Sequence, residues 1–402
     1  MNMNIKNKYN MCRLALVVSF LAGWLVLADT PWPAVNFTFG LCLGAVVYLV
    51  ALTAADGPLG PLVIRQNLER VGLVNKKGEA PFLLCKQKDP DNPNGFILTF
   101  ENREIPRERW EEKQIEIESA LNIFIIKIKS GKNRRLVDVY AVLADCGLPD
   151  KVLWTDSLLS VEEFVLVLGQ GLAGLVTVNL TKIPHILIGG STGSGKSVLL
   201  KLLLMQCIQK DASLYLCDFK GGIDYPGWQY ICHMVCNENK LLDTLKELTG
   251  ELETRKNVLH EAGCPNLETY NKKVRHLYKR IIIAIDEVAE VLDKTGRTKE
   301  DKERIDTIIG YLSTIARQGR AVGIHLILST QRPDATILPG QVKNNIDCRI
   351  CGRADNVLSQ IVLDSAEANT TIPKDAQGRF LMSDGTIFQG FWSGNLDEWF
   401  LL

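Results

Sequence analysis

The chain has 402 residues, of which 46% are hydrophobic, enough to bury a full core and to predict roughly two domains beyond any membrane segment. This composition excludes an intrinsically disordered protein. Lys plus Arg and Asp plus Glu both total 46, so net charge gives no general attraction to nucleic acid, and any contact with a polyanion must come from local basic patches. The 11 cysteines are scattered through expected strands and helices, which implies reduced thiols in a cytosolic body and no disulfide framework.

Two apolar runs predict a membrane anchor of two transmembrane helices within residues 1–56. Leu14–Ala28 is uncharged, and Val35–Ala55 is long enough for a hydrocarbon core that needs ~20 helical residues. Basic residues precede the first run and follow the second, which places the amino terminus and the body on the cytoplasmic side of the cell membrane. A signal peptide cleaved near Ala28 is the alternative, and it would leave the second run as the sole anchor.

Residues 57–160 are expected to form a linker and a small α/β subdomain. The sequence predicts strands at Phe96–Phe100, Ile123–Lys129 and Leu136–Val142, and a charged amphipathic helix at Arg107–Leu121. The last two strands are expected to form a hairpin with a turn that begins at Ser130.

The turn of this hairpin carries a basic cluster. Its members are Lys127, Lys129, Lys132, Arg134 and Arg135. The cluster is large enough to contact a phosphate backbone if it faces a ligand. The alternative is a solvated hairpin tip, since no aromatic residues are interleaved with these side chains along the sequence.

The segment Gly190–Ser197 fits the phosphate-binding pattern GxxxxGK[ST], between an apolar run at His185–Ile188 and a helix that follows at Val198–Leu204. In such a loop, backbone N–H groups converge on the phosphates, and Lys196 places a positive charge near the β and γ phosphates. We therefore predict binding of ATP or GTP. The nucleotide-binding residues are Gly190, Ser191, Thr192, Gly193, Ser194, Gly195, Lys196 and Ser197.

A second motif is the apolar run Ile281–Ile285, which ends in Asp286 and Glu287. A buried strand in this context places the two carboxylates at the carboxyl edge of a parallel sheet, beside the phosphate loop. We predict that Asp286 holds Mg²⁺ together with Ser197, and that Glu287 orients and deprotonates the attacking water. The alternative is an acidic pair that caps the next helix.

Two further strands are expected to end at the same edge. His325–Leu328 leads to Gln331, whose side-chain amide is our candidate sensor of the γ-phosphate. Ser213–Cys217 leads to Asp218–Gly222, where a functional role and a simple turn are equally consistent with the sequence. Residues 161–402 therefore predict a largely parallel sheet with crossover helices.

Together these motifs resemble the FtsK/SpoIIIE family of ring-forming DNA translocases, in the HerA-FtsK branch of P-loop ATPases. The segments that carry the resemblance are Leu168–Gln170, Ile183–Ser197, Glu253–Lys256, Asn266–Asn271 and, most specifically, Ala316–Pro333. The region from Phe96 to Val142 also resembles the α/β subdomain that precedes the motor in this family. The resemblance implies a RecA-like motor domain over residues 161–402 and ATP as the nucleotide.

The resemblance further implies a homo-hexameric ring around DNA, with ATP bound between subunits. Arg349 and Arg353 match arginines of the family's corresponding segment and are candidates for the residue that completes a neighbour's site, with Arg320 as a third. Arg332 and Lys343 lie where the family's DNA-channel loop is expected.

Other positions depart from the family pattern. Asn356 and Gln360 stand where basic residues are expected in the channel region. The sequence after Gly378–Gly385 leaves no room for the family's orientation-reading winged-helix domain, which disfavours a role in chromosome segregation.

The expected organisation is most similar to the membrane-anchored coupling ATPases of Gram-positive conjugative elements. That similarity predicts ATP-driven DNA translocation in conjugative transfer, with a relaxase and membrane channel proteins as partners. The alternatives are a double-stranded DNA pump for chromosome segregation at division or sporulation, a related ATPase for protein export, and a nucleotide-gated membrane scaffold.

Overall fold

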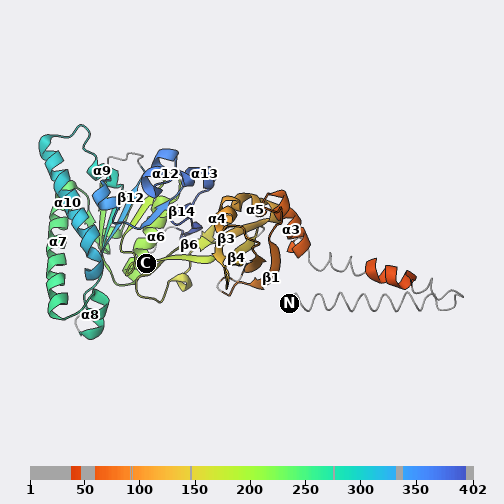
Figure 1. Ribbon diagram of the computed structural model, residues 1–402. Coiled ribbons are helices and arrows are strands. Elements are labelled where there is room, and N and C mark those ends of the chain that lie inside the picture. Colours follow the sequence, from red (N-terminus) through yellow and green to blue (C-terminus); the bar gives the residue numbers. More distant parts are fainter. Residues whose placement is uncertain are drawn as a thin grey trace. The chain divides into compact units, whose positions relative to one another are not determined.

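The computed structural model describes residues 38–46, 59–90, 92, 94–144, 147–274, 277–331 and 338–394. It divides into two compact units, Met1–Gly147 and Leu148–Leu402 (Figure 1). Residues 148–160, which the sequence analysis placed with the small subdomain, contribute a short strand to the second unit. This strand, β5 (Val152–Leu153), pairs in parallel with β15 (Ile387–Trp392).

The predicted membrane anchor falls mostly outside the described residues. The expected span Leu14–Ala28 lies entirely outside them, and of Val35–Ala55 only residues 38–46 are described, where the chain is helical. No helix within the described ranges has the length and apolar character needed to cross a bilayer.

The first unit is a four-stranded antiparallel sheet with helices. Its elements are α3 (Pro61–Arg70), β1 (Phe82–Lys88), β2 (Gly95–Glu101), α4 (Arg107–Glu112), α5 (Gln114–Leu121), β3 (Ile123–Ser130) and β4 (Leu136–Leu143). The strand order is β1-β2-β4-β3. The three predicted strands are confirmed, and β1 was missed. The single helix expected at Arg107–Leu121 is two helices, because Lys113 leaves the helical conformation at φ −96° and ψ 9°.

The core of the first unit lies between the sheet and its helices and is centred on Trp110. This side chain is fully buried, its ring centroid lies 5.1 Å from that of Phe100, and its indole N–H donates to Asn102 Oδ1 at 2.7 Å. The indole thus packs its apolar body in the core while its polar atom has a partner, as a buried tryptophan requires.

The second unit is built on one mixed sheet, with strand order β10-β9-β11-β12-β8-β13-β14-β15-β6-β7. Its strands, besides β5 and β15, are β6 (Val165–Gly171), β7 (Gly174–Asn179), β8 (Ile186–Gly189), β9 (Ser213–Asp218), β10 (His233–Val235), β11 (Ile281–Asp286), β12 (Ile324–Thr330), β13 (Cys348–Cys351) and β14 (Arg379–Met382). From β10 to β13 all pairings are parallel, and from β13 to β7 they are antiparallel. The largely parallel sheet is confirmed, with an antiparallel extension that the sequence did not predict.

Helices cover both faces of this sheet (Figure 1). They are α6 (Lys196–Gln209), α7 (Glu238–Glu261), α8 (Leu267–Lys273), α9 (Val288–Leu292), α10 (Lys299–Val322), α11 (Gly340–Lys343), α12 (Asn356–Leu363) and α13 (Glu367–Thr371), with short 3₁₀ turns η3 (Asp156–Leu158) and η4 (Trp228–Tyr230). Strand β11 is apolar throughout because both of its faces are buried. Ile281, Ile283 and Ile285 join the core beneath α7 and α10, whereas Ile282 and Ala284 join the core beneath α6. A strand buried on both faces needs such an unbroken run.

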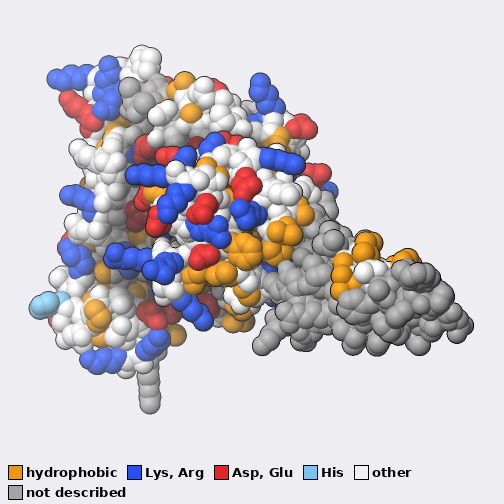
Figure 2. All heavy atoms as spheres, turned by 45° about the vertical axis from the view of Figure 1, so that its right-hand side comes forward, with side chains coloured by type: hydrophobic (Ala, Val, Ile, Leu, Met, Phe, Trp, Pro, Cys, Tyr) orange, Lys and Arg blue, Asp and Glu red, His pale blue; other side chains and the backbone are white. Residues whose placement is uncertain are grey.

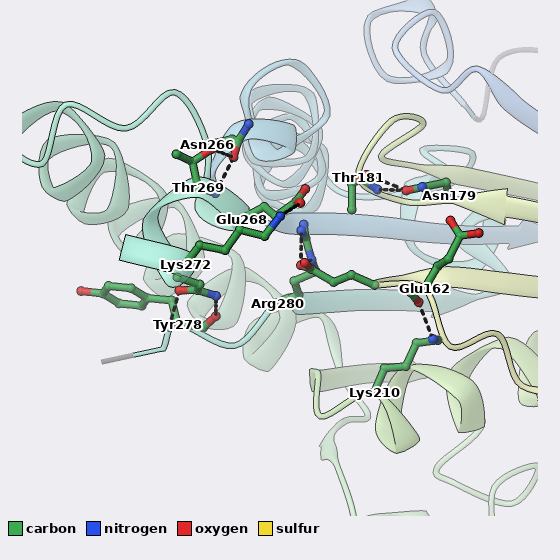
Figure 3. A network of polar contacts seen from close by, with 12 residues as sticks. Glu162, Asn179, Thr181, Lys210, Asn266, Glu268, Thr269, Lys272, Tyr278 and Arg280 are labelled. Atoms are coloured by element: carbon green, nitrogen blue, oxygen red, sulfur yellow. Dashed lines mark hydrogen bonds and ion pairs between the residues drawn. The ribbon is translucent and has the colours of Figure 1, made fainter. Parts of the chain in front are cut away.

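Polar contacts gather around the amino-terminal ends of the central strands (Figure 3). Arg280, just before β11, pairs with Glu163 at 2.8 Å, Lys272 pairs with Glu268 at 2.5 Å, and Lys210 Nζ donates to the Glu162 carbonyl at 2.8 Å. The phosphate-binding motif follows the carboxyl end of β8, so this network belongs to the opposite edge of the sheet and not to the nucleotide site.

Candidate functional site

The phosphate-binding motif forms a loop between β8 and α6. Gly195, the residue before α6, has φ +95°, a conformation that L side chains rarely adopt. A Cβ at this position would lie 3.0 Å from the Cα of Gly378, so the loop backbone meets the turn before β14 without room for a side chain. The contact is tied by a hydrogen bond from Gly378 N to the Ser194 carbonyl at 2.9 Å.

Lys196 and Asp286 form a buried ion pair at the centre of the site. Lys196 Nζ lies 2.8 Å from Asp286 Oδ1 and 2.9 Å from Ser329 Oγ, and Ser329 Oγ in turn donates to Asp286 Oδ1 at 2.8 Å. The exposed fractions of the two charged side chains are only 3% and 6%. Three neighbouring strand ends, those of β8, β11 and β12, therefore bring these groups together.

The electrostatics of Asp286 follow from these partners. Burial raises the pKa of this carboxyl, but the charge of the Lys196 ammonium and hydrogen bonds from Lys196, Ser329 and Tyr225 outweigh burial and bring the pKa below its usual value. Asp286 is therefore ionised at neutral pH, as a carboxylate that binds a divalent cation must be.

Glu287 is held by β12. Thr330 Oγ1 donates to Glu287 Oε1 at 3.0 Å, and the backbone N–H of Gln331 donates to Glu287 Oε2 at 2.9 Å. The backbone of Glu287 is left-handed, with φ 65°, a strained conformation for a non-glycine residue that is common at functional sites. It turns the chain sharply between β11 and α9 and fixes the carboxylate beside Asp286.

Gln331 joins the phosphate loop to β12. Thr192 Oγ1 donates to its Oε1 at 3.1 Å. The predicted sensor thus lies in hydrogen-bond contact with the segment that carries the phosphate-binding motif, between that segment and Glu287.

The hydroxyl groups of Ser194 and Ser197 in the loop have no hydrogen-bond partner among the described residues. Ser194 Oγ is buried and accepts and donates no hydrogen bond, and the exposed Ser197 makes no side-chain hydrogen bond to a described residue. A buried hydroxyl without a partner is costly. Oxygen ligands and backbone N–H groups are what a Mg²⁺–triphosphate needs, so the residues present fit this group.

A cavity of about 310 Å³ opens beside the loop. Its lining includes Gly195, Val198, Leu199, Gly378, Phe391 and Trp392. Lys151 Nζ lies 3.5 Å from the centroid of the Trp392 ring. The mixture of glycine backbone, aliphatic and aromatic surface suits a flat, apolar ring system.

The three arginine candidates have different surroundings. Arg353 binds its own phosphate loop, since Nη2 donates to the Thr192 carbonyl at 2.8 Å and Nη1 to the Lys374 carbonyl at 2.7 Å. Arg349 pairs with Asp364, just after α12. Arg320 lies near the carboxyl end of α10, where Nε donates to the Thr181 carbonyl at 3.3 Å.

The predicted DNA contacts are only partly described. Arg332 lies outside the described residues. Lys343 Nζ pairs with Asp364 at 2.6 Å, and the exposed fraction of its side chain is 15%. Asp364 thus pairs with both Lys343 and Arg349, which leaves one net positive charge on these three side chains.

Sequence reasoning missed two residues of this site, Tyr225 and Ser329. Tyr225 OH donates to Asp286 Oδ2 at 2.9 Å and comes from an irregular segment far away in the chain. Ser329 was seen only as the end of a strand. Asp218, whose role was left open, accepts hydrogen bonds from the backbone N–H groups of Lys220 and Gly222 at 3.0 and 2.8 Å, so it shapes its own turn.

Comparisons with known proteins agree on one family. The FtsK/SpoIIIE family model matches residues 160–335. The DNA translocase FtsK of Leptospira interrogans is 30% identical over 284 residues, covering 66% of this chain and 29% of that protein. That of Clostridium acetobutylicum is 32% identical over 222 residues, covering 52% and 28% respectively. The chain therefore spans less than a third of the length of these two relatives.

A solved structure that is similar to this chain is matched over nearly the whole of its own length. It is the conjugation coupling protein TcpA of the Clostridium perfringens plasmid pCW3, in a monomer form with ATPγS. The identity is 35%, the TM-score is 0.62, and the match covers 85% of this chain and 98% of that one.

Proposed function

The chain belongs to the FtsK/SpoIIIE family of ATPases, and on this premise we propose that it is an ATP-driven DNA translocase acting as the coupling protein of a conjugative element. The observation that carries the proposal is the Lys196–Asp286–Ser329 cluster beside Glu287. It lies in a chain of which 85% matches a conjugation coupling protein, over 98% of that protein's structure. A chromosome-segregation pump is the second candidate, because the curated relatives are named DNA translocase FtsK.

The residues of the site divide the chemistry as follows. The loop Gly190–Ser197 binds the triphosphate through its backbone N–H groups, and Lys196 leaves Asp286 to bind phosphate oxygens. Ser197 and Asp286 would hold Mg²⁺, directly or through water, and the ion would supply positive charge to offset that of the phosphates. Glu287 orients the attacking water and takes its proton, and Gln331 responds to loss of the γ-phosphate.

The adenine base fits the 310 Å³ cavity beside Gly195. Val198 and Phe391 are among its apolar lining residues, and its position next to the loop leaves the phosphates in reach of Lys196. This assignment favours ATP as the nucleotide, and competition of ATP and GTP for binding measures the preference.

The arginine that acts on a neighbouring subunit is Arg349 or Arg353, with Arg320 third, in a hexameric ring. Replacing the right residue with Ala should lower hydrolysis by ~10³-fold and leave nucleotide binding intact. Because Arg353 also holds the Thr192 carbonyl of its own loop, Arg353→Ala should in addition weaken nucleotide binding. Binding and turnover measured on all three variants separate these roles; normal hydrolysis by all three contradicts the assignment.

Two regions are proposed separately as DNA contacts: Arg332 and Lys343 in the second unit, and the basic hairpin between β3 and β4 in the first unit. On that hairpin Lys129, Lys132, Arg134 and Arg135 are exposed, and none forms an ion pair with a described residue. Cationic and anionic side chains are intermingled on the face shown in Figure 2. Lys127 and Lys129 also lie over the ring of Tyr140, at 4.3 and 5.5 Å from its centroid, so an aromatic residue of the neighbouring strand is interleaved with the cluster after all. An unneutralised cluster of this kind favours phosphate contact.

DNA should stimulate ATP hydrolysis, and DNA binding should weaken steeply as salt rises. Each phosphate contact adds about 0.9 to the slope of log affinity against log salt on duplex DNA. The triple variant K132Q/R134Q/R135Q should therefore lose up to about 2.7 from that slope. The control is K246Q/K299Q/K302Q, at exposed lysines of α7 and α10. An equal slope in both triple variants rejects the hairpin contact, whereas ATPase activity indifferent to DNA rejects the translocase itself.

Residues 1–56 are proposed as a membrane anchor with the ATPase on the cytoplasmic side. Protease accessibility of the carboxyl-terminal unit in intact cells tests this topology.

A relaxase and membrane channel proteins are the proposed partners. Binding of a co-encoded relaxase would favour conjugation over chromosome segregation.

A further inference from the structure

Tyr225 is fixed in the interior next to the nucleotide site. Its exposed fraction is 1%, and its ring meets that of the fully buried Trp228 edge-on at a centroid distance of 5.5 Å. The backbone N–H of Tyr225 donates to the Gly222 carbonyl at 3.1 Å. Packing and backbone bonding therefore leave the phenol little freedom, and its hydroxyl points at Asp286 Oδ2 at 2.9 Å.

The two oxygens of Asp286 have different kinds of partner. Oδ1 accepts from Lys196 and Ser329, whereas Oδ2 accepts from Tyr225. A lysine that moves to phosphate when nucleotide binds is an exchangeable partner. If Lys196 moves to phosphate, Oδ2 still accepts from Tyr225, and Oδ1, which keeps its hydrogen bond from Ser329, can take a cation in place of the lysine.

We propose that Tyr225 is a positioning residue that holds the Asp286 carboxylate in the orientation required to bind a divalent cation. The inference rests on the proposed role of Asp286 as a Mg²⁺ ligand, direct or through water. A carboxylate held at one oxygen cannot rotate when Lys196 departs, so its other oxygen keeps its direction toward the cation. Residues that orient metal ligands in this way typically contribute 10- to 100-fold to metal affinity.

The test is Tyr225→Phe, which removes the hydroxyl and keeps the ring. Binding of Mn²⁺ to the full chain with a non-hydrolysable ATP analogue is followed by the electron paramagnetic resonance signal of free Mn²⁺. We expect Mn²⁺ affinity to fall at least 10-fold, with a matching rise in the Mg²⁺ concentration for half-maximal ATPase activity. Turnover at saturating Mg²⁺ and nucleotide affinity measured in EDTA should stay near wild type. A loss of general packing would not produce this split.

The matched control is Tyr230→Phe, on the same segment but 83% exposed, which should leave Mn²⁺ affinity unchanged. Should Tyr225→Phe not fold, 3-fluorotyrosine at position 225 keeps the hydroxyl and changes its donor strength, and Mn²⁺ affinity must then shift. Wild-type Mn²⁺ affinity in a folded variant overturns the role of Tyr225. If the wild-type chain itself shows no nucleotide-dependent Mn²⁺ binding, the proposed site fails instead.

Discussion

Lys196→Ala should abolish nucleotide binding and lower ATP hydrolysis by about 10³-fold or more. The substitution removes the Lys196 ammonium from the phosphate loop, and loss of a single preorganised group at a developing charge already costs ~10²–10³-fold in turnover. Binding of a fluorescent ATP analogue and steady-state hydrolysis measure the two effects. The control is Lys302→Ala, an exposed lysine of α10, which should behave as wild type.

The same variant should also be less stable without nucleotide. Breaking a buried ion pair leaves one charge uncompensated and typically costs ~3–5 kcal/mol of stability. We expect a loss near the lower end of this range, because Ser329 and Tyr225 still donate hydrogen bonds to Asp286. In the wild type, the lowered pKa of Asp286 contributes stability above the unfolded pKa and loses it as pH falls through the folded value. In Lys196→Ala, the ammonium no longer offsets the effect of burial on the Asp286 carboxyl, so its pKa should rise. Lowering the pH should therefore reduce the difference in free energy of unfolding between the wild type and the variant. Urea unfolding of both proteins at pH 7 and pH 5 measures this difference. A rate of ATP hydrolysis above a tenth of the wild-type rate would contradict the role assigned to Lys196.

Glu287→Gln should lower hydrolysis by ~10²–10⁴-fold while nucleotide binding persists. The amide has nearly the shape of the carboxylate but cannot take a proton from water. The amide can keep both contacts, because its oxygen can accept from the Gln331 backbone N–H and its NH₂ group can donate to Thr330 Oγ1. ATP should therefore accumulate uncleaved on the protein, which single-turnover measurements detect.

In cells, this variant should fail to support DNA transfer. The matched control is Glu290→Gln, the next carboxylate along the chain, in α9, which should hydrolyse ATP and transfer DNA normally. Transfer at wild-type frequency with Glu287→Gln would reject a motor driven by this site.

The fold around the nucleotide could be predicted because its signals are local. The glycines before Lys196, and the unbroken apolar run before Asp286, each carry their meaning within a few residues. Parallel strands then place their carboxyl ends at one edge, so Asp286 and the end of β12 could be expected near the loop. The family resemblance inferred from these segments is confirmed by the match to residues 160–335.

The remainder depends on contacts between distant segments. Nothing in the sequence around Tyr225 indicates that its hydroxyl meets Asp286, because the irregular turn that carries it has no periodic pattern. Likewise, Arg353 was expected to face a neighbour, and only the structure shows its guanidinium on the Thr192 carbonyl of its own chain. The antiparallel extension through β14 and β15 was missed because strand partners are not written in the pattern of a single strand.

The close approach of Gly195 and Gly378 has a consequence for how such motors evolve. A Cβ built on Gly195 would lie 3.0 Å from the Cα of Gly378. Gly390 N in turn donates to the Gly378 carbonyl at 2.7 Å. A lineage that acquired a bulkier residue at one of them would need a compensating shift at the other. Recombination between related genes would therefore have to transmit the last two strands together with the phosphate loop, as a single heritable block.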